Sequence, residues 1–160
     1  MKEKVLVFEA GKCTGCRICE QWCSLEHFSV AGPALSRITI IRDHGSQVDN
    51  GIICHQCAHA PCVSSCKPGA LSKSDATGAI IVDLEKCNGC RRCIRACPHG
   101  AIRMHPDEKY VLICDLCGGN PRCVRHCPEQ AVQYLERGKA ERPYRSALVR
   151  GRPKGGKCNE

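Results

Sequence analysis

Cysteine is the residue type in this sequence with the greatest capacity for chemistry. The chain has 160 residues, of which 17 are Cys, a density found in disulfide scaffolds and in proteins that bind metals or iron–sulfur clusters. Sixteen of them form four sets of four, named quartets I to IV in chain order. Quartet I is Cys13, Cys16, Cys19 and Cys23, quartet II is Cys54, Cys57, Cys62 and Cys66, quartet III is Cys87, Cys90, Cys93 and Cys97, and quartet IV is Cys114, Cys117, Cys123 and Cys127.

The spacing within the quartets is that of ligands to cubane clusters. Quartets I and III read C-x2-C-x2-C-x3-C, and quartets II and IV widen the middle gap to four and five residues. In bacterial ferredoxins this spacing lets three Cys bind one cluster while the fourth binds a second. Because a compact loop brings three thiolates to three irons of one cube, the next Cys points elsewhere and clusters come in pairs. Four complete quartets therefore predict four [4Fe–4S] clusters.

Other uses of cysteine fit the pattern less well. Zinc ribbons use C-x2-C pairs, but the third closely spaced Cys and the Cys-Pro ending have no role in a ribbon. A disulfide framework is disfavoured because no secretion signal is apparent. A Rieske centre needs two His ligands, and His55 and His59 lie inside a quartet that is already complete, so we expect them at the surface or behind the ligands. An [3Fe–4S] centre, a radical enzyme or a cluster-based sensor would lack a Cys, and none is missing.

A short repeat follows the last Cys of quartets II, III and IV. Each has a Pro soon after the Cys and then an Ala-aliphatic pair, at Ala70-Leu71, Ala101-Ile102 and Ala131-Val132. The Pro ends the short helix that carries the ligand, and the apolar pair begins a strand packed on the cluster. Residues 70–73 and 79–83 then predict a hairpin turned at 75–78. Quartets II and III thus form one complete two-cluster unit, and by elimination quartet I pairs with quartet IV. The fold class expected is α+β.

Composition indicates a thin organic core and a cytoplasmic protein. The chain holds one Trp, three Tyr and two Phe, so the clusters must supply much of what fixes the fold. The sequence shows no signal peptide and no stretch long enough to cross a membrane, so no direct membrane insertion is expected. The formal charge is +8, and four clusters of about −2 each would bring it near zero. Basic residues crowd the cluster loops at Lys12, Arg17, Lys86, Arg91, Arg92, Arg95, Arg122 and Arg125.

Over about residues 4–136 the quartets and their nested order resemble the four-cluster ferredoxin subunits of complex oxidoreductases, such as the B subunit of dimethyl sulfoxide reductase and hydrogenase electron-transfer components. The resemblance implies two interleaved ferredoxin-like modules and four ligand sets. Cluster 1 would be held by Cys13, Cys16, Cys19 and Cys127, cluster 2 by Cys54, Cys57, Cys62 and Cys97, cluster 3 by Cys87, Cys90, Cys93 and Cys66, and cluster 4 by Cys114, Cys117, Cys123 and Cys23. The outer module would comprise residues 1–50 and 106–140, and the inner module residues 51–105. The chain departs from the family pattern at Ser24 and Lys67, where Pro is common.

The same resemblance implies electron transport in anaerobic metabolism. The compact chain looks most like the polyferredoxin subunit of tungsten aldehyde oxidoreductases, and next like those of benzoyl-CoA reductase, carbon monoxide dehydrogenase, formate dehydrogenase or hydrogenase. The partners implied are a catalytic tungsten or molybdenum pterin subunit and a flavoprotein or ferredoxin, with self-association also open. The sequence has no nucleotide-binding Gly loop, zinc-hydrolase motif or recognisable Ser/His/Asp grouping, so we expect no catalysis by the chain itself.

Three features remain outside the quartets. Residues 141–160 form a basic tail, either a solvated segment or an arm that docks on a partner; it lacks aromatic platforms for nucleic acid, which is not an expected partner. Cys158 in this tail is predicted to be a free thiol. Residues 37–42 predict a strand, and Trp22, beside Cys23, is expected to shield a cluster.

Overall fold

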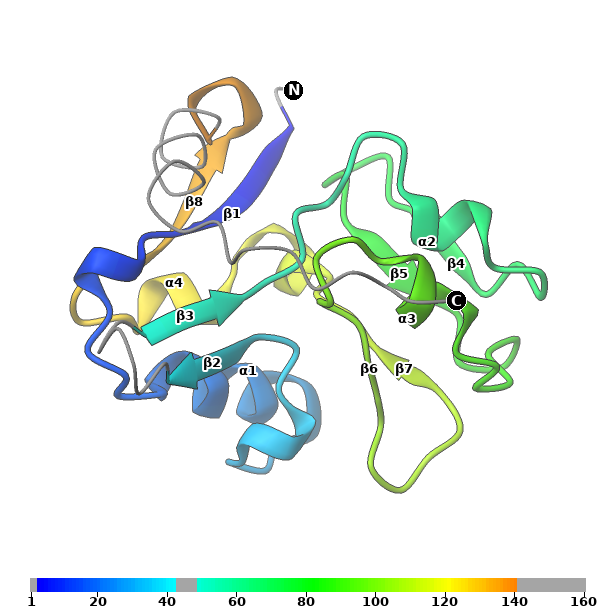
Figure 1. The fold of residues 1–160 in the computed structure, drawn as a ribbon, viewed down its shortest axis with the longest axis horizontal. Coiled ribbons are helices and arrows are strands. Elements are labelled where there is room, and N and C mark those ends of the chain that lie inside the picture. The colour runs from blue at the N-terminus through cyan, green and yellow to red at the C-terminus, as the bar shows by residue number, and fades with distance from the viewer. Residues whose placement is uncertain (1–2, 43–48, 141–160) are drawn as a thin grey trace, which may run out of the picture.

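The computed structural model describes residues 3–42 and 49–140, and it is an α+β fold of short elements (Figure 1). The strands are β1 (Lys4–Phe8), β2 (Thr39–Arg42), β3 (Asp49–Ile52), β4 (Leu71–Lys73), β5 (Ile80–Val82), β6 (Arg103–Met104), β7 (Val111–Leu112) and β8 (Val132–Glu136). The helices are α1 (Ile18–Phe28), α2 (Pro61–Ser64), α3 (Arg92–Ala96) and α4 (Arg122–Arg125), with 3-10 turns η1 (Ala10–Lys12), η2 (Pro33–Leu35) and η3 (Leu116–Gly119). The expected fold class is confirmed.

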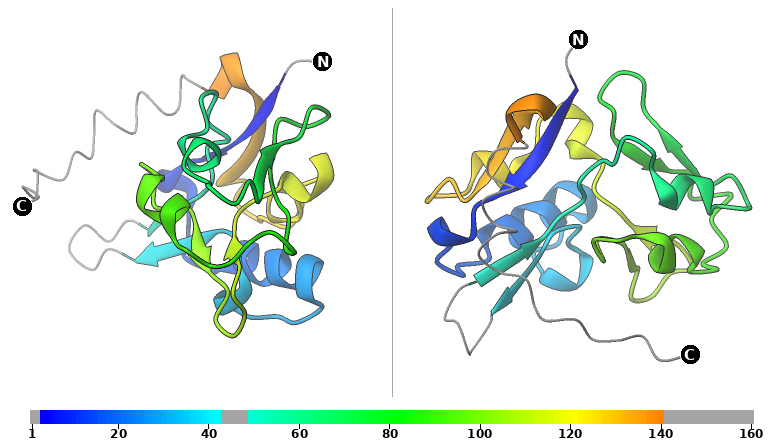
Figure 2. Two further views of the ribbon diagram at one scale, coloured as in Figure 1. Left: turned by 90° about the vertical axis from the view of Figure 1, so that its right-hand side faces the viewer. Right: turned by 45° about the horizontal axis from the view of Figure 1, so that its top comes forward.

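Each sheet of the described chain is an antiparallel pair of strands: β1 with β8, β2 with β3, β4 with β5, and β6 with β7. The β4–β5 pair is the hairpin predicted from residues 70–83, and β2 lies within the strand expected at residues 37–42. The β1–β8 pair joins the two ends of the described chain, and the two strands lie side by side in all views (Figures 1 and 2). Quartets I and IV are therefore brought together by the closing of the chain on itself.

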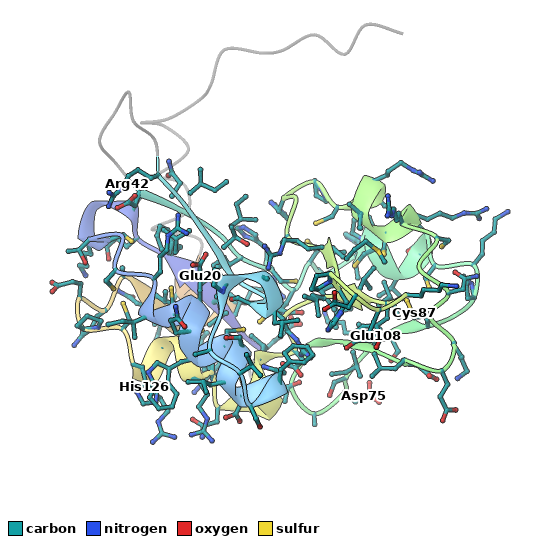
Figure 3. All side chains as sticks on the ribbon, turned by 90° about the horizontal axis from the view of Figure 1, so that it is seen from below. Glu20, Arg42, Asp75, Cys87, Glu108 and His126 are labelled. Carbon is teal, nitrogen blue, oxygen red and sulfur yellow. The ribbon has the colours of Figure 1, made fainter. Side chains whose placement is uncertain are left out.

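Two pairs of helices accompany these sheets. Helix α1 packs against α4, and α2 packs against α3. Glu20 of α1, labelled in Figure 3, is 2 % exposed and accepts a hydrogen bond from the backbone N–H of Ile40 at 2.7 Å, which fixes α1 beneath β2. The expected module boundary at 50/51 falls within β3, and that at 105/106 falls in the turn between β6 and β7.

The core is thin, as the composition predicts, and cysteine is part of it. One buried cluster combines Leu6, Ile38 and Ile40 with Cys19, Cys23 and Cys123. A second combines Leu71, Ile80 and Ile113 with Cys54, Cys62 and Cys93. The thiols of the quartets therefore lie where a larger domain would place aliphatic side chains. Among the helices of the described ranges, none has the length and apolar character needed to span a bilayer.

Candidate iron–sulfur sites

Every quartet begins with the same backbone turn. The residue before the second Cys has a positive φ in each: Gly15 (+67°), Gln56 (+47°), Gly89 (+69°) and Leu116 (+61°). This left-handed conformation is open to Gly but costs other residues about 1 kcal/mol or more. The turn curls the chain so that the first two Cys face the same space. Quartets II and IV make it with a buried side chain instead of Gly.

The third Cys of each quartet lies in the first turn of a short helix. Cys19, Cys62, Cys93 and Cys123 are on α1, α2, α3 and α4, and all four are buried. In three of these helices the residue that precedes the first turn is again left-handed: Arg17, Ala60 and Arg91. The sharp entry into the helix turns the third thiol back toward the first two.

Three small cavities of nearly equal size are each lined by four Cys. The first is lined by Cys13, Cys16, Cys19 and Cys127, the second by Cys54, Cys57, Cys62 and Cys97, and the third by Cys66, Cys87, Cys90 and Cys93. In every case the fourth thiol comes from another quartet. These are the groupings expected for clusters 1, 2 and 3, and the structure brings their residues together.

The repeat that follows the last Cys forms one wall of each cavity. Pro128, Ala131 and Val132 line the first, Pro98, Ala101 and Ile102 the second, and Pro68, Ala70 and Leu71 the third. The chain turns after each of these Cys residues, because the backbone N–H of Gly69, Gly100 or Gln130 donates a hydrogen bond to the carbonyl of the Cys three residues earlier. The predicted packing of the Ala-aliphatic pair against the cluster space is what the structure has.

The remaining four thiols gather deep in the molecule. A charge on Cys23 or Cys117 would raise the pKa of Cys123, and a charge on Cys123 or Cys23 would raise the pKa of Cys114, so the four lie close together. A charge on Cys54 of the second cavity would also raise the pKa of Cys114. Cys114 packs against both buried clusters of side chains. A charge on Cys19 of the first cavity would likewise raise the pKa of Cys123. The site expected for cluster 4 therefore lies between those of clusters 1 and 2.

Burial makes free thiolates unfavourable at these positions. It raises the pKa of Cys19 and Cys54 to about 12 and the pKa of Cys93 and Cys117 to about 11. A buried thiolate is stabilised when it coordinates a metal cation, which deprotonates the thiol outright. Four thiols converging on a small space with apolar walls are a donor set that fits a [4Fe–4S] cluster.

A charged network flanks Cys23. His27 lies 3.0 Å from the Asp115 carboxylate, and Arg37 lies 2.7 Å from its other oxygen. Burial opposes the charged form of His27, but hydrogen bonds with Asp115 and Cys23 outweigh it and raise the pKa of His27 to about 10. The backbone N–H of Arg37 also donates to Cys23 Sγ at 3.2 Å. The network places two cations and one carboxylate beside the expected cluster 4.

The cysteines differ in exposure in a way that follows the order of the sites. Of the sixteen described Cys, only Cys16 and Cys90 are exposed. Cys16 belongs to the cluster 1 site and Cys90 to the cluster 3 site. Clusters 2 and 3 would share one buried core, in which α2 packs on α3. The sites therefore run in the order 1, 4, 2, 3, with the exposed cysteines at the two ends.

Gln56 is the most informative residue that the sequence did not single out. Its side chain is fully buried, donates to the Cys114 carbonyl at 2.7 Å and accepts from the Ile80 N–H at 2.9 Å. It thus links quartet II, the β4–β5 hairpin and quartet IV. The signal available was its place before Cys57, where quartets I and III have Gly. Nothing in the sequence showed that its amide would meet two buried backbone groups.

The histidines, the tryptophan and the basic residues that the sequence placed near the clusters differ in exposure and in their contacts. His55 is half-buried and stacks on His99, with centroids 3.9 Å apart, whereas His59 is exposed. Trp22 is 37 % exposed and stacks on His126. Of the basic residues in the cluster loops, Lys12, Lys86 and Arg122 form ion pairs with Glu9, Asp83 and Glu26. The basic tail and Cys158 lie outside the described residues.

Residues 50–137 match the model of the 4Fe-4S dicluster domain family, and the chain belongs to that family. The chain is 46% identical over 106 residues to the polyferredoxin-like subunit of an aliphatic sulfonate oxidoreductase from Pyrococcus furiosus, covering 66% of this chain and 60% of the relative. The chain therefore spans less than two thirds of that relative. It is 35% identical over 122 residues to a putative electron transport protein, YsaA, of Escherichia coli, covering 71% and 75%.

Among solved structures, a chain of the active site complex BamBC of benzoyl coenzyme A reductase is similar over its length. The TM-score is 0.52 at 28% identity, and the match covers 94% of this chain and 91% of that chain. The family and the sixteen Cys of the described sites give a protein with four [4Fe–4S] clusters as cofactors.

Proposed function

We propose that this chain is a non-catalytic electron-transfer subunit, in which four [4Fe–4S] clusters relay single electrons between a catalytic oxidoreductase subunit and a redox partner. The observation that carries the proposal is the placement of the two exposed ligands. Cys16 and Cys90 belong to the first and last sites in the order 1, 4, 2, 3, and the sites between them have no exposed Cys. A relay needs an accessible centre at each end and shielded centres between.

Residues of this chain connect the cluster sites, shield them from water and set the charge beside them. A bound [4Fe–4S] cluster supplies one-electron redox chemistry. Cys66, Cys97 and Cys127 each line the cavity of another quartet, and Cys23 lies near Cys123, so these four are proposed to connect neighbouring sites. The apolar residues after the last Cys of quartets II, III and IV shield the cavity walls from water. His27 and Arg37, with the Asp115 carboxylate between them, leave a net positive charge beside the buried cluster 4 site, and net positive charge raises a cluster's reduction potential.

The partner is proposed to carry a tungsten or molybdenum pterin, as an aldehyde oxidoreductase does, with a flavoprotein or ferredoxin at the other end. The support is the resemblance of the quartets to subunits of such complexes and the similarity to subunits whose names include an aliphatic sulfonate oxidoreductase and benzoyl coenzyme A reductase. A cytoplasmic location is part of the same proposal. The outer and inner modules, residues 1–50 with 106–140 and residues 51–105, are proposed as its two halves.

Iron and acid-labile sulfide analysis of anaerobically purified protein tests the proposal at its base. About sixteen iron and sixteen sulfide per chain are expected for four cubane clusters. The tagged chain should then be recovered from its own cells with its partner subunits, and these identified by mass spectrometry and by metal and flavin content. Electrons from the catalytic subunit's substrate should bleach the cluster absorbance of this chain. Stoichiometric zinc without sulfide, or clusters that no co-purified enzyme reduces or oxidises, would contradict the proposal.

A further inference from the structure

Among residues 3–42 and 49–140, strand β1 pairs along one edge only, and its other edge is free. The register of β1 with β8 is regular, with Lys4 opposite Glu136 and Phe8 opposite Val132. The ladder continues with Arg137 N–H donating to Glu3 and Glu9 N–H donating to Ala131. Hydrogen-bonded pairs alternate with non-hydrogen-bonded pairs in an antiparallel ladder. Val5 and Val7 therefore bond to β8, while the N–H and C=O groups of Leu6 and Phe8 point away from it.

Nothing in the described part of the chain satisfies those groups. No strand other than β8 pairs with β1, and no hydrogen bond outside the ladder reaches the backbone of Leu6 or Phe8 within residues 3–42 and 49–140. Leu6 is only 3 % exposed. Backbone groups that are buried are nearly always paired, so an edge with unpaired groups at a buried position indicates a missing hydrogen-bonding partner.

The free edge borders a large apolar groove. Its volume is about 550 Å³, and four consecutive residues of β1, Val5 to Phe8, line it. Because side chains alternate between the two faces of a strand, a groove lined by consecutive residues runs along the edge itself. Phe8 lies against Gly51 of β3, where a Cβ would come within 2.5 Å of the Phe8 ring, and it narrows the groove between β1 and β3. A channel bordered by a strand edge fits an extended peptide.

The groove also lies beside the cluster 2 site. His55, Cys57 and His99 line both the groove and the cavity of that site, and the two His rings stack between them. Cys16 and Cys90 belong to the end sites of the order 1, 4, 2, 3, and neither of them lines the groove. A segment bound there would hold a partner against the middle of the relay and leave both exposed ends free.

The charges favour a segment from another protein over the chain's own tail. The ionisable side chains of the groove include Arg137, His55 and His99 but no carboxylate. Arg137 is already paired with Glu3 at 2.8 Å. Residues 141–160 contain six Lys and Arg but only two Glu, so the tail would bring cations to an apolar lining that has no carboxylate to pair with them. An apolar segment without net positive charge complements this lining better.

We propose that the free edge of β1 binds an extended, apolar segment of the catalytic partner subunit, which pairs with β1 as a third strand. This inference rests on the proposed function, since the partner is the oxidoreductase subunit that exchanges electrons with this chain. The backbone of Leu6 and Phe8 supplies the hydrogen bonds, and the groove takes the apolar side chains of the segment.

Residue-resolved hydrogen–deuterium exchange tests the pairing. The cluster-loaded chain is compared alone and in the complex recovered through a tag on the chain, with its subunits identified. The amides of Leu6 and Phe8 should exchange at least about tenfold more slowly in the complex, whereas those of Val5 and Val7 should be protected in both samples. This alternation is the signature of an added strand.

A matched pair of variants tests the groove. Asn50→Trp places a large ring in the groove from an exposed position of β3, and Ala76→Trp places the same ring at an exposed position between β4 and β5. Asn50→Trp should weaken assembly at least about tenfold with cluster content unchanged, and Ala76→Trp should leave assembly unchanged.

The outcomes separate this inference from the proposed function. A complex that transfers electrons while Leu6 and Phe8 exchange as in the free chain overturns the docking site and leaves the proposed function intact. Protection of the same amides in the isolated chain also overturns it, because the tail or a second copy then fills the edge; a chain ending at residue 140 and a measurement of mass in solution tell these apart. Failure to assemble or to exchange electrons in any form counts against the proposed function itself.

Discussion

Trp22 and His126 stack face to face, with ring centroids 3.6 Å apart and ring planes within 5°. Each directly precedes a cysteine that is expected to bind the cluster of another quartet, Cys23 or Cys127. The stack therefore joins α1 to the end of α4 at the point where the sites expected for clusters 1 and 4 exchange ligands. Figure 3 shows His126 on the opposite half of the molecule from Cys87 of the inner quartets. Shielding of a cluster by Trp22 was predicted, whereas its partner ring was not.

Trp22→Ala should destabilise the outer sites without removing a ligand. A stacked aromatic pair contributes about 1 kcal/mol beyond the area that it buries, and its loss opens a path for solvent and oxygen. We expect a lower Tm and a several-fold faster loss of cluster absorbance in air. Trp22→Phe should retain most of the wild-type behaviour, because it keeps a ring over His126.

Leu25→Ala is the matched control for this prediction. Leu25 lies on the same helix and is 37 % exposed, the same exposed fraction as Trp22. If Leu25→Ala accelerates cluster loss as much as Trp22→Ala, the effect belongs to the apolar surface of α1 and the stack has no special part in it.

Gln56→Ala should be among the most destabilising single changes outside the cysteines. It leaves the buried N–H of Ile80 and the buried carbonyl of Cys114 without partners, and each loss costs about 1 to 3 kcal/mol. A reduction of about 2 to 4 kcal/mol in the free energy of unfolding is expected, measured as a Tm decrease of the cluster-loaded protein. The contact bridges quartets II and IV, so cluster loss should begin in the middle of the relay.

Gln130→Ala separates the hydrogen bonds from the backbone strain. Gln130 also has a left-handed backbone, with φ of +51°, but its side chain is exposed. The same substitution there should change Tm very little. Equal destabilisation by the two variants would show that Ala in the left-handed conformation, and not the lost bridge, is the cause.

The sequence was informative where the chemistry imposes fixed spacing. Sixteen Cys, the Pro after the quartets and the Ala-aliphatic pairs predicted the cavity walls and the β4–β5 hairpin, because ligand geometry restricts the chain near a cluster. Contacts that join distant segments gave no local signal. The β1–β8 pairing, the Asp115–His27–Arg37 network and the stack on Trp22 each combine residues far apart in sequence whose types are ordinary at the surface. Tertiary placement alone makes them part of the sites.

Glu3 is predicted to stabilise the fold in a pH-dependent way. Its carboxylate lies 2.8 Å from Arg137 and 2.7 Å from Lys73, which ties β1 to the end of β4 and to the residue after β8. The Arg137 hydrogen bond, with help from Lys73, outweighs burial and lowers the pKa of Glu3 below 4.5. A carboxylate with a lowered pKa adds stability that is fully present above pH 4.5 and is lost as the pH falls through its folded-state pKa.

Glu3→Gln should lower Tm at pH 7 by a few degrees, corresponding to about 1 kcal/mol for a partly exposed network. The difference from wild type should shrink as the pH is lowered below 4.5. Glu85→Gln, which makes the same charge change at an exposed position, should leave Tm unchanged at every pH. A Tm difference for Glu3→Gln that is the same at pH 7 and in acid would rule out the ionised carboxylate as its source.

The crossing of ligands between quartets gives the sharpest test of the sites. Cys97 belongs to quartet III by sequence but lines the cavity of Cys54, Cys57 and Cys62. Cys97→Ser should therefore alter or remove the cluster built on quartet II, and the cluster built on Cys87, Cys90 and Cys93 should keep its spectrum. Electron paramagnetic resonance of the reduced protein, with iron and sulfide content, measures the loss of one centre. Cys158→Ser, outside the quartets, is the control and should retain all four clusters.

Cys127→Ser extends the same test to the outer pair. Its thiol lines the cavity of Cys13, Cys16 and Cys19, more than a hundred residues earlier in the chain, so the substitution should disturb the cluster built on quartet I and spare the one built on quartet III. The two variants should therefore affect different centres, and a double variant should show the sum of the two changes. Loss of the quartet III centre in Cys97→Ser, or of the quartet IV centre in Cys127→Ser, would instead mean that each quartet holds its own cluster and that the nested ligation is wrong.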